Sequence, residues 1–212
     1  DNVPDRDAAL DALRVLKDLA MRYDLVAREE IDKGITKKHL AEEQNRLVRE
    51  RAAKLEDLRK SFNSAVVSSN RQSAGYSLED LLRDLFALFE IEYRKPFRTE
   101  TQQIDGHFNF QGFDYLVEAK WRQDHPTEQE LGAFKHKVDS KLESTRGLFV
   151  SIPGFRSQVV AQFNGRGPNL ILMNGSDVIH ILEGRIDLRD GLKRKIEKAA
   201  QEGIVFAPLY EG

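Results

Sequence analysis

The sequence predicts an α/β fold in which helices cover both faces of a mixed central β-sheet, with an α-helical extension at the N-terminal end. Two observations support this. From about residue 71 onward, short apolar runs of strand length alternate with segments of helical periodicity. The first 67 residues are instead dense in Ala, Leu, Glu, Lys and Arg, with few Gly or Pro. We therefore expect a helical extension over residues 1–70 and one α/β domain over residues 71–212.

Composition narrows the functional classes. The 212 residues are 40% hydrophobic, which is enough for a sizeable core. Lys and Arg total 33 against 35 Asp and Glu, so the near-zero net charge disfavours a protein that coats DNA but allows an enzyme with a local basic groove. The absence of Cys excludes disulfides, thiolate metal sites and Cys nucleophiles.

The sequence also bears on the cellular location of the protein. No apolar run approaches the roughly 20 residues of a membrane span, and no signal-peptide pattern opens the chain. We expect a cytoplasmic protein with no membrane partner. The chain begins at Asp1 rather than Met, which is compatible with a fragment of a longer protein.

Two apolar stripes predict two long helices in the extension, separated at Lys33-Gly34. The second stripe is narrow and flanked by charges of both signs, which fits a hairpin packed on itself or a coiled-coil-like contact. The coiled-coil-like contact would join a homodimer or bind another protein partner. The alternative is a solvated helical extension with a single apolar stripe. The stripes consist of Leu10, Leu13, Leu16 and Ala20, and of Leu40, Leu47, Leu55, Leu58, Phe62 and Val66.

Beyond a polar linker at residues 67–75, the pattern specifies the elements of the α/β domain. Ser77 is expected to cap an amphipathic helix, and Thr127 with Glu130 forms a capping-box pattern that opens another, with core positions up to Leu142. Shorter helices are expected around Val159–Phe163 and over Leu188–Gln201. Besides a central hairpin, strands are expected at Ile91–Tyr93, Gly147–Ile152, Leu170–Met173, Val178–Leu182 (after a turn at Asn174-Gly175) and Ile204–Ala207.

A predicted β-hairpin in the middle of the α/β domain contains the candidate catalytic residues. It runs from Gln103 to Phe110, turns at Gln111-Gly112-Phe113, and returns over residues 114–121. Because side chains alternate along a strand, Asp105 shares a face with His107, while Glu118 and Lys120 lie together on an otherwise apolar run. Buried charges need compensation, and a divalent cation held by Asp105 and Glu118, with Lys120 beside it, would supply it. The alternative is a structural salt-bridge cluster.

Other residues could complete such a site. Glu79 falls at the margin of the apolar arc of its helix, where a carboxylate can reach inward as a third metal ligand; an ordinary helix-flank glutamate is the alternative. Basic and polar side chains near the site are candidates for DNA contact, although solvated positions explain them equally well. These candidates are Lys135, Lys137, Lys141, Arg146, His107 and Gln103.

Three segments resemble the PD-(D/E)XK nuclease superfamily, and within it the restriction-endonuclease-like proteins of the Mrr type. They are Gly75–Leu82, Gln103–Gly106 and Leu116–Trp121; Arg146–Phe155 is also similar, so the resemblance covers about Gly75 to Ala207. The family's Asp and ExK triplet match Asp105 and Glu118 with Lys120, and its frequent helical acidic residue matches Glu79. Ile104 stands where the family name has Pro.

The resemblance implies a restriction-endonuclease-like fold and a restriction- or defence-type DNA endonuclease that uses Mg²⁺ or Mn²⁺ as cofactor. Asp105 and Glu118 would bind the ion, Glu79 would add a ligand directly or through water, and Lys120 would orient the attacking water. Double-strand cleavage by one-site nucleases is usually done by dimers, so we expect a homodimer. The alternatives are a catalytically silent DNA-binding module and a helical interaction protein whose α/β domain is a scaffold.

Overall fold

A computed structural model describes residues 5–67, 78–94, 97–98, 103–165 and 168–210. Within these ranges, residues 25–36, 97–98 and 103–104 are described by their backbone alone. The expected linker from Ser68 to Gly75 and the expected cap Ser77 lie outside these residues. The elements are α1 (Arg6–Val67), α2 (Leu78–Leu88), β1 (Tyr93–Arg94), β2 (Phe97–Arg98), β3 (Gln103–Ile104), β4 (Gly106–Phe110), β5 (Phe113–Lys120), α3 (Glu128–Asp139), β6 (Thr145–Ser151), α4 (Ser157–Phe163), β7 (Leu170–Asn174), α5 (Gly175–Leu182) and α6 (Leu188–Glu202).

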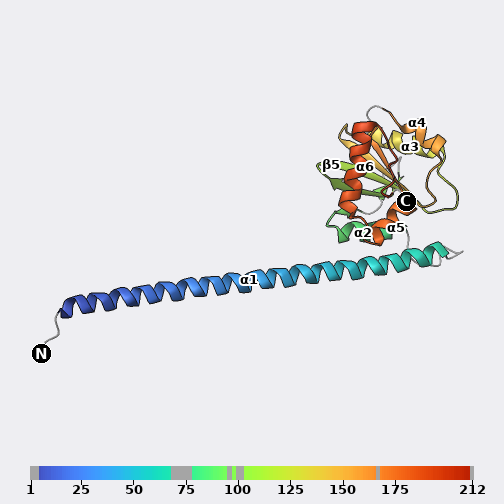
Figure 1. The fold of residues 1–212 in the computed structure, drawn as a ribbon. Coiled ribbons are helices and arrows are strands. Elements are labelled where there is room, and N and C mark those ends of the chain that lie inside the picture. The colour runs from blue at the N-terminus through green and yellow to red at the C-terminus, as the bar shows by residue number, and fades with distance from the viewer. Residues whose placement is uncertain (1–4, 68–77, 95–96, 99–102, 166–167, 211–212) are drawn as a thin grey trace. The chain divides into compact units, whose positions relative to one another are not determined.

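Helix α1 is continuous, so the predicted break at Lys33-Gly34, and with it a hairpin, is wrong (Figure 1). A single Gly in a helix costs only about 1 kcal/mol relative to Ala, and strong helix formers surround Gly34 on both sides. None of the described helices is both long and apolar enough to cross a lipid bilayer.

The contacts divide the chain into two units, Asp1–Glu50 and Arg51–Gly212, rather than at the expected linker. The reason lies in the last turns of α1, which carry the buried residues Leu55, Phe62 and Ala65. The Phe62 ring packs on Trp121 with a centroid distance of 5.2 Å. These turns therefore belong to the core of the second unit.

The second unit is built on a five-stranded mixed sheet of order β1-β4-β5-β6-β7. The β1/β4 and β4/β5 pairs are antiparallel, whereas β5/β6 and β6/β7 are parallel. Strands β2 and β3 form a separate antiparallel pair. This architecture confirms the predicted fold class, a mixed central β-sheet flanked by helices.

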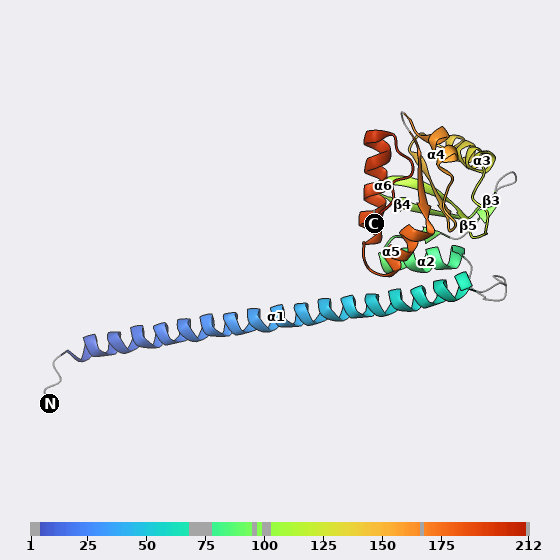
Figure 2. The ribbon, with the colours of Figure 1, turned by 45° about the vertical axis from the view of Figure 1, so that its right-hand side comes forward.

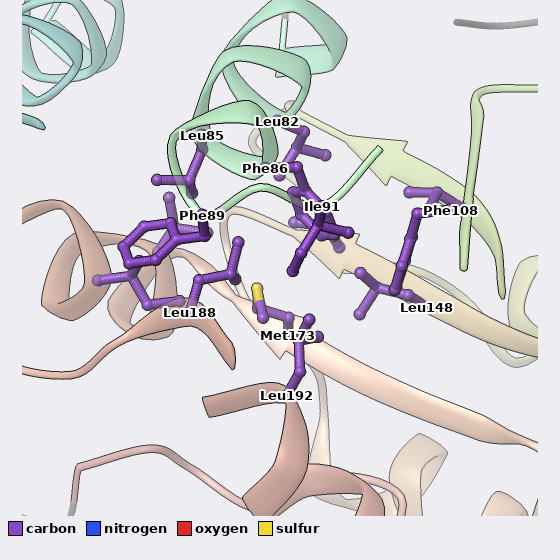
Figure 3. Packing of buried hydrophobic residues seen from close by; sticks show 14 of the residues in the cluster. Leu82, Leu85, Phe86, Phe89, Ile91, Phe108, Leu148, Met173, Leu188 and Leu192 are labelled. Carbon is purple, nitrogen blue, oxygen red and sulfur yellow. The ribbon is translucent and has the colours of Figure 1, made fainter. Parts of the chain in front are cut away.

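Helices cover both faces of the sheet (Figure 2). One face packs against α2, α5, α6 and the end of α1. Figure 3 shows part of this core, in which Phe86 of α2 packs on Phe108 of β4 and Phe89, just after α2, lies near Leu188 of α6. The other face packs against α3 and α4, whose buried residues contact the strands through Leu116, Phe149 and Leu172.

The predicted hairpin is confirmed as β4 and β5. Its two-residue turn uses Gln111 and Gly112, both with positive φ (52° and 80°). Two left-handed residues in a two-residue loop match the right-handed twist of antiparallel strands. The turn thereby fixes the register of the pair, with Gly106 opposite Val117.

Two predicted strands near the C-terminal end are wrong. Residues Gly175–Leu182 form α5, because Asn174 caps the helix and Asp177 completes a capping box. A short apolar run such as Val178–Leu182 fits a buried helix as well as a strand. Residues 204–207 are irregular and make one backbone bond to the sheet, from the Leu172 amide to the Val205 carbonyl (2.9 Å).

Most other helices and strands follow the prediction. The Thr127 and Glu130 side chains form the predicted capping box of α3. That helix ends at Asp139, so Leu142, expected in its core, is exposed instead.

A buried ion pair fixes the C-terminal segment. Lys195 of α6 is 0% exposed, and its Nζ lies 2.7 Å from Asp177 Oδ2. The same Nζ donates to the Ala207 carbonyl (2.7 Å), and the Leu209 amide donates to Asp177 Oδ1 (2.8 Å). The two charges therefore stabilise a stretch of chain that has no regular secondary structure.

We expect Lys195→Met to lower the free energy of unfolding by about 3–5 kcal/mol, because it leaves Asp177 buried without its partner. Lys198→Met is the matched control: it removes an exposed pair with Glu202 on the same helix and should cost less than about 0.5 kcal/mol. Urea denaturation followed by circular dichroism measures both. Equal costs for the two variants would contradict the structural role of the buried pair.

Candidate active site

Strand pairing brings Asp105 beside Glu118-Ala119-Lys120. Asp105 immediately precedes β4, and its backbone amide donates to the Val117 carbonyl (3.2 Å). The Ala119 amide in turn donates to Asp105 Oδ2 (3.1 Å). These two hydrogen bonds hold Asp105 and its carboxylate against the neighbouring strand, and the residue is only 7% exposed.

The Glu118 carboxylate is held by two lysines. Lys120 Nζ, from the same strand, lies 2.7 Å from Glu118 Oε1. Lys137 Nζ, from α3, lies 3.0 Å from Oε2. The Glu118 side chain is 13% exposed and points to the face of the sheet that α3 covers, as the burial pattern of β5 indicates.

The electrostatics of Asp105 oppose its ionisation. Burial is the main cause that raises the pKa of Asp105 above its ordinary value, and repulsion from Glu118 and Glu79 adds to it. The Ala119 hydrogen bond and the charge of Lys120 act in the opposite direction. The protein therefore maintains a carboxylate where its charged form is unfavourable, which is typical of functional sites.

Lys120 is maintained in its charged form. Burial disfavours the ammonium, but the hydrogen bond and charge of Glu118, together with Asp105, outweigh it, so that the pKa of Lys120 lies above its ordinary value. A lysine in this form donates hydrogen bonds and neutralises negative charge, and it does not accept a proton.

Glu79 lies within electrostatic range of the site. It is half-buried in the first turn of α2, and its charge contributes to the raised pKa of Asp105. Among the side chains that the structure describes, no group of three His, Asp or Glu residues is arranged to hold an ion. The prediction allowed Glu79 to add a ligand directly or through water, and the described side chains do not show the direct arrangement. Mg²⁺ commonly needs only one or two carboxylates besides water and phosphate oxygens, so Asp105 and Glu118 fit it.

Sequence reasoning missed Tyr93. Its hydroxyl donates to the Asp105 carbonyl (3.5 Å), and burial, with the charges of Asp105 and Glu79, raises its pKa. The ring passes so close to Gly106 that a Cβ at that position would collide with the phenol. The glycine directly after Asp105 was the one signal in the sequence that another group approaches there.

The residues predicted to contact DNA lie in different parts of the domain. His107 shares the Glu118 face and its Nε2 lies 2.9 Å from Asp114 Oδ1. Lys137 is at the site. Lys135 pairs with Asp139 (2.7 Å), away from Glu118, and Lys141 is exposed beyond the end of α3.

The other two candidates are farther along the sheet or outside the description. Arg146 of β6 lies opposite Tyr115 of β5. Its guanidinium is 3.6 Å from the centroid of the Phe113 ring. It is not brought to the carboxylates. The Gln103 side chain lies outside the described residues, although its backbone is in β3.

A family model described as restriction endonuclease matches residues 71–182, more than half of the chain. The chain belongs to the restriction endonuclease family. This confirms the resemblance to nucleases of the Mrr type, and the matched region contains Glu79, Asp105, Glu118 and Lys120. No curated protein matches the chain. Membership of the restriction endonuclease family implies DNA as the ligand, and its members generally use divalent metal ions.

We expect Asp105→Asn to stabilise the protein at neutral pH when no metal is added. The asparagine oxygen can still accept from Ala119, but the unfavourable buried charge is gone. Because the folded-state pKa of Asp105 is raised, the wild type loses stability as pH rises from the ordinary carboxyl pKa through the raised one. The advantage of the variant should therefore be complete at pH 7 and vanish in acid.

Thermal unfolding of both proteins from acid to neutral pH measures this effect. Glu92→Gln is a suitable control, because Glu92 is exposed and pairs with Arg94 at the surface. An Asp105→Asn protein that is less stable than wild type at pH 7 would show that the carboxylate is a structural group.

Proposed function

We propose that this chain is an endonuclease that hydrolyses DNA phosphodiester bonds with Mg²⁺ or Mn²⁺, in a restriction or defence role. The observation that carries the proposal is the pairing of Asp105 with the Glu118-Ala119-Lys120 segment, in a chain of the restriction endonuclease family. Asp105 and Glu118 would hold the ion, and Glu79 would contribute through a water molecule.

The roles of the side chains follow from their charges. A bound divalent ion lowers the pKa of a coordinated water and stabilises charge that develops on the phosphate. Lys120, held as an ammonium by Glu118 and Asp105, orients the attacking water by donating to it and neutralises charge on the phosphoryl oxygens. The Ala119 amide keeps the Asp105 carboxylate in its binding position.

DNA would approach at the end of the sheet where Asp105 and Glu118 lie. Lys137 of α3 contacts Glu118 there, and His107 lies on the same face of the sheet as Glu118. Lys135 and Lys141 extend the basic character along and beyond α3. Phosphate contacts of this kind position a duplex without reading its sequence. Arg146 and Gln103 are proposed as outer contacts.

We expect Lys120→Ala and Asp105→Asn each to lower the rate of plasmid nicking by about 100-fold or more in Mg²⁺, since each removes a group that acts on the transition state. EDTA should abolish nicking by the wild type. Gel assays that separate supercoiled, nicked and linear plasmid measure these rates.

Lys198→Ala, which removes an exposed lysine of α6, is the control and should nick like the wild type. Equal nicking by Lys120→Ala and wild type would remove Lys120 from the mechanism. No nicking by any protein, with DNA binding retained, would favour a catalytically silent binding module.

We also propose that α1 joins two copies of the chain. In the unit Asp1–Glu50, large apolar side chains of the described part of the helix are exposed, and several of them recur at the a and d spacing of a coiled coil. A second copy would present the same stripe, and two nuclease sites would serve the two DNA strands. Leu16 and Tyr23 share one of these positions, and Leu19, Leu40 and Leu47 share the other.

The double substitution Leu16→Glu/Leu19→Glu is expected to convert a dimer into a monomer, because it places charges in the apolar stripe. The monomer should still nick plasmid but should produce little linear product. Light scattering coupled to gel filtration measures the mass, and Arg14→Glu, outside the a and d positions, serves as the charge control. A wild type that is monomeric both alone and with DNA would refute this arrangement.

A further inference from the structure

One carboxylate with two ammonium partners is an unusual arrangement for a metal ligand. Both oxygens of Glu118 are engaged, Oε1 by Lys120 and Oε2 by Lys137. A cation that binds Glu118 needs one of these oxygens, and it repels both lysines. Because the ion repels both ammonium groups, its binding favours the withdrawal of one of them from the carboxylate.

Lys137 is the one that can withdraw. Lys120 sits on the same strand as Glu118, and the charge of Asp105 acts on it as well. Lys137 reaches the site from α3, and its flexible stem can carry the ammonium toward solvent. The two lysines are similarly exposed, at 24% for Lys137 and 29% for Lys120, so the added attraction of Asp105 for Lys120 is what distinguishes them. The outward direction is also the one from which a DNA phosphate would arrive.

We propose that Lys137 is a positioning residue that holds Glu118 until the site binds metal, and that it then turns its ammonium to a DNA phosphate. This inference rests on the proposed function. It predicts that Lys137 opposes metal binding when DNA is absent and strengthens DNA binding when metal is present. Metal and DNA would thus bind with positive coupling, part of which passes through this one side chain.

Lys135 provides a matched control on the same helix. It has the same charge and is also paired, but its partners are Asp139 (2.7 Å) and Asn169 (3.4 Å) instead of Glu118. Its removal changes the charge of α3 by the same amount as removal of Lys137. A difference between the two variants therefore reports the surroundings of Lys137, which include its contact with Glu118.

The first test is a Mg²⁺ and Mn²⁺ titration without DNA, read by isothermal calorimetry and by the rise in melting temperature. We expect Lys137→Met to bind the ion about fivefold or more tightly than wild type, whereas Lys135→Met should match wild type. Lys137→Arg, which keeps the positive charge, should restore weak binding. Equal or weaker binding by Lys137→Met would overturn the proposal; Lys137→Gln repeats the test if the Met variant does not fold.

The second test measures the affinity for a short duplex with and without Ca²⁺, which takes the same kind of oxygen ligands, under conditions where no cleavage occurs. Lys137→Met should bind DNA like wild type without Ca²⁺ and at least about fivefold more weakly with it. Lys135→Met should show the same change in both conditions. A loss for Lys137→Met that does not depend on Ca²⁺ would contradict the exchange of partners.

The nuclease function and the exchange by Lys137 can fail separately. If the wild type binds no divalent ion in either test, the proposed nuclease function fails, and the inference fails with it. If the wild type binds metal and cleaves DNA but Lys137→Met binds metal no more tightly, only the exchange by Lys137 is wrong.

Discussion

The hydrogen bond from the Ala119 amide to the Asp105 carboxylate joins the two halves of the site. It exists because β4 and β5 pair in one register, and that register is fixed by the left-handed residues of the Gln111-Gly112 turn. A slip of one residue would turn Glu118 and Lys120 to the opposite face of the sheet. The chemistry of the site therefore depends on a two-residue loop at the far end of the hairpin.

The protein contains two kinds of buried charge. Asp177 and Lys195 are enclosed, and their remaining hydrogen-bonding capacity is used by backbone groups of the C-terminal segment. The carboxylates near Asp105 instead repel one another and are balanced by lysines that remain partly accessible. The first arrangement stabilises the fold, whereas the second leaves an electrostatic imbalance that a ligand of opposite charge can relieve.

The sequence allowed much of this to be predicted where one signal was sufficient. Alternation placed Asp105 near Glu118 and Lys120, and the Thr127 and Glu130 pair located the start of α3. Predictions failed where a local pattern had two solutions. The apolar run after Asn174 suited strand and helix alike, and Gly34 was given more weight as a helix breaker than about 1 kcal/mol supports.

The parts of the site that could not be predicted depend on contacts between distant segments. Nothing in the residues around Tyr93 indicates that its hydroxyl meets Asp105, because that contact requires β1 to pair with β4. The contact of Lys137 with Glu118 requires the packing of α3 on the sheet. The periodicity of the sequence predicts which face of a helix or strand such residues occupy, but it does not predict which residues they contact.

The contact between Phe62 and Trp121 has a consequence for how such a chain can be divided or recombined. Trp121 follows Lys120 directly, and it packs on a ring supplied from before the region that the family model covers. A fragment that starts at residue 71 would lack Leu55, Phe62 and Ala65 and would open the hydrophobic interior next to the nuclease motif. Exchange of N-terminal arms between related nucleases would therefore preserve the interior only when the junction lies before Arg51.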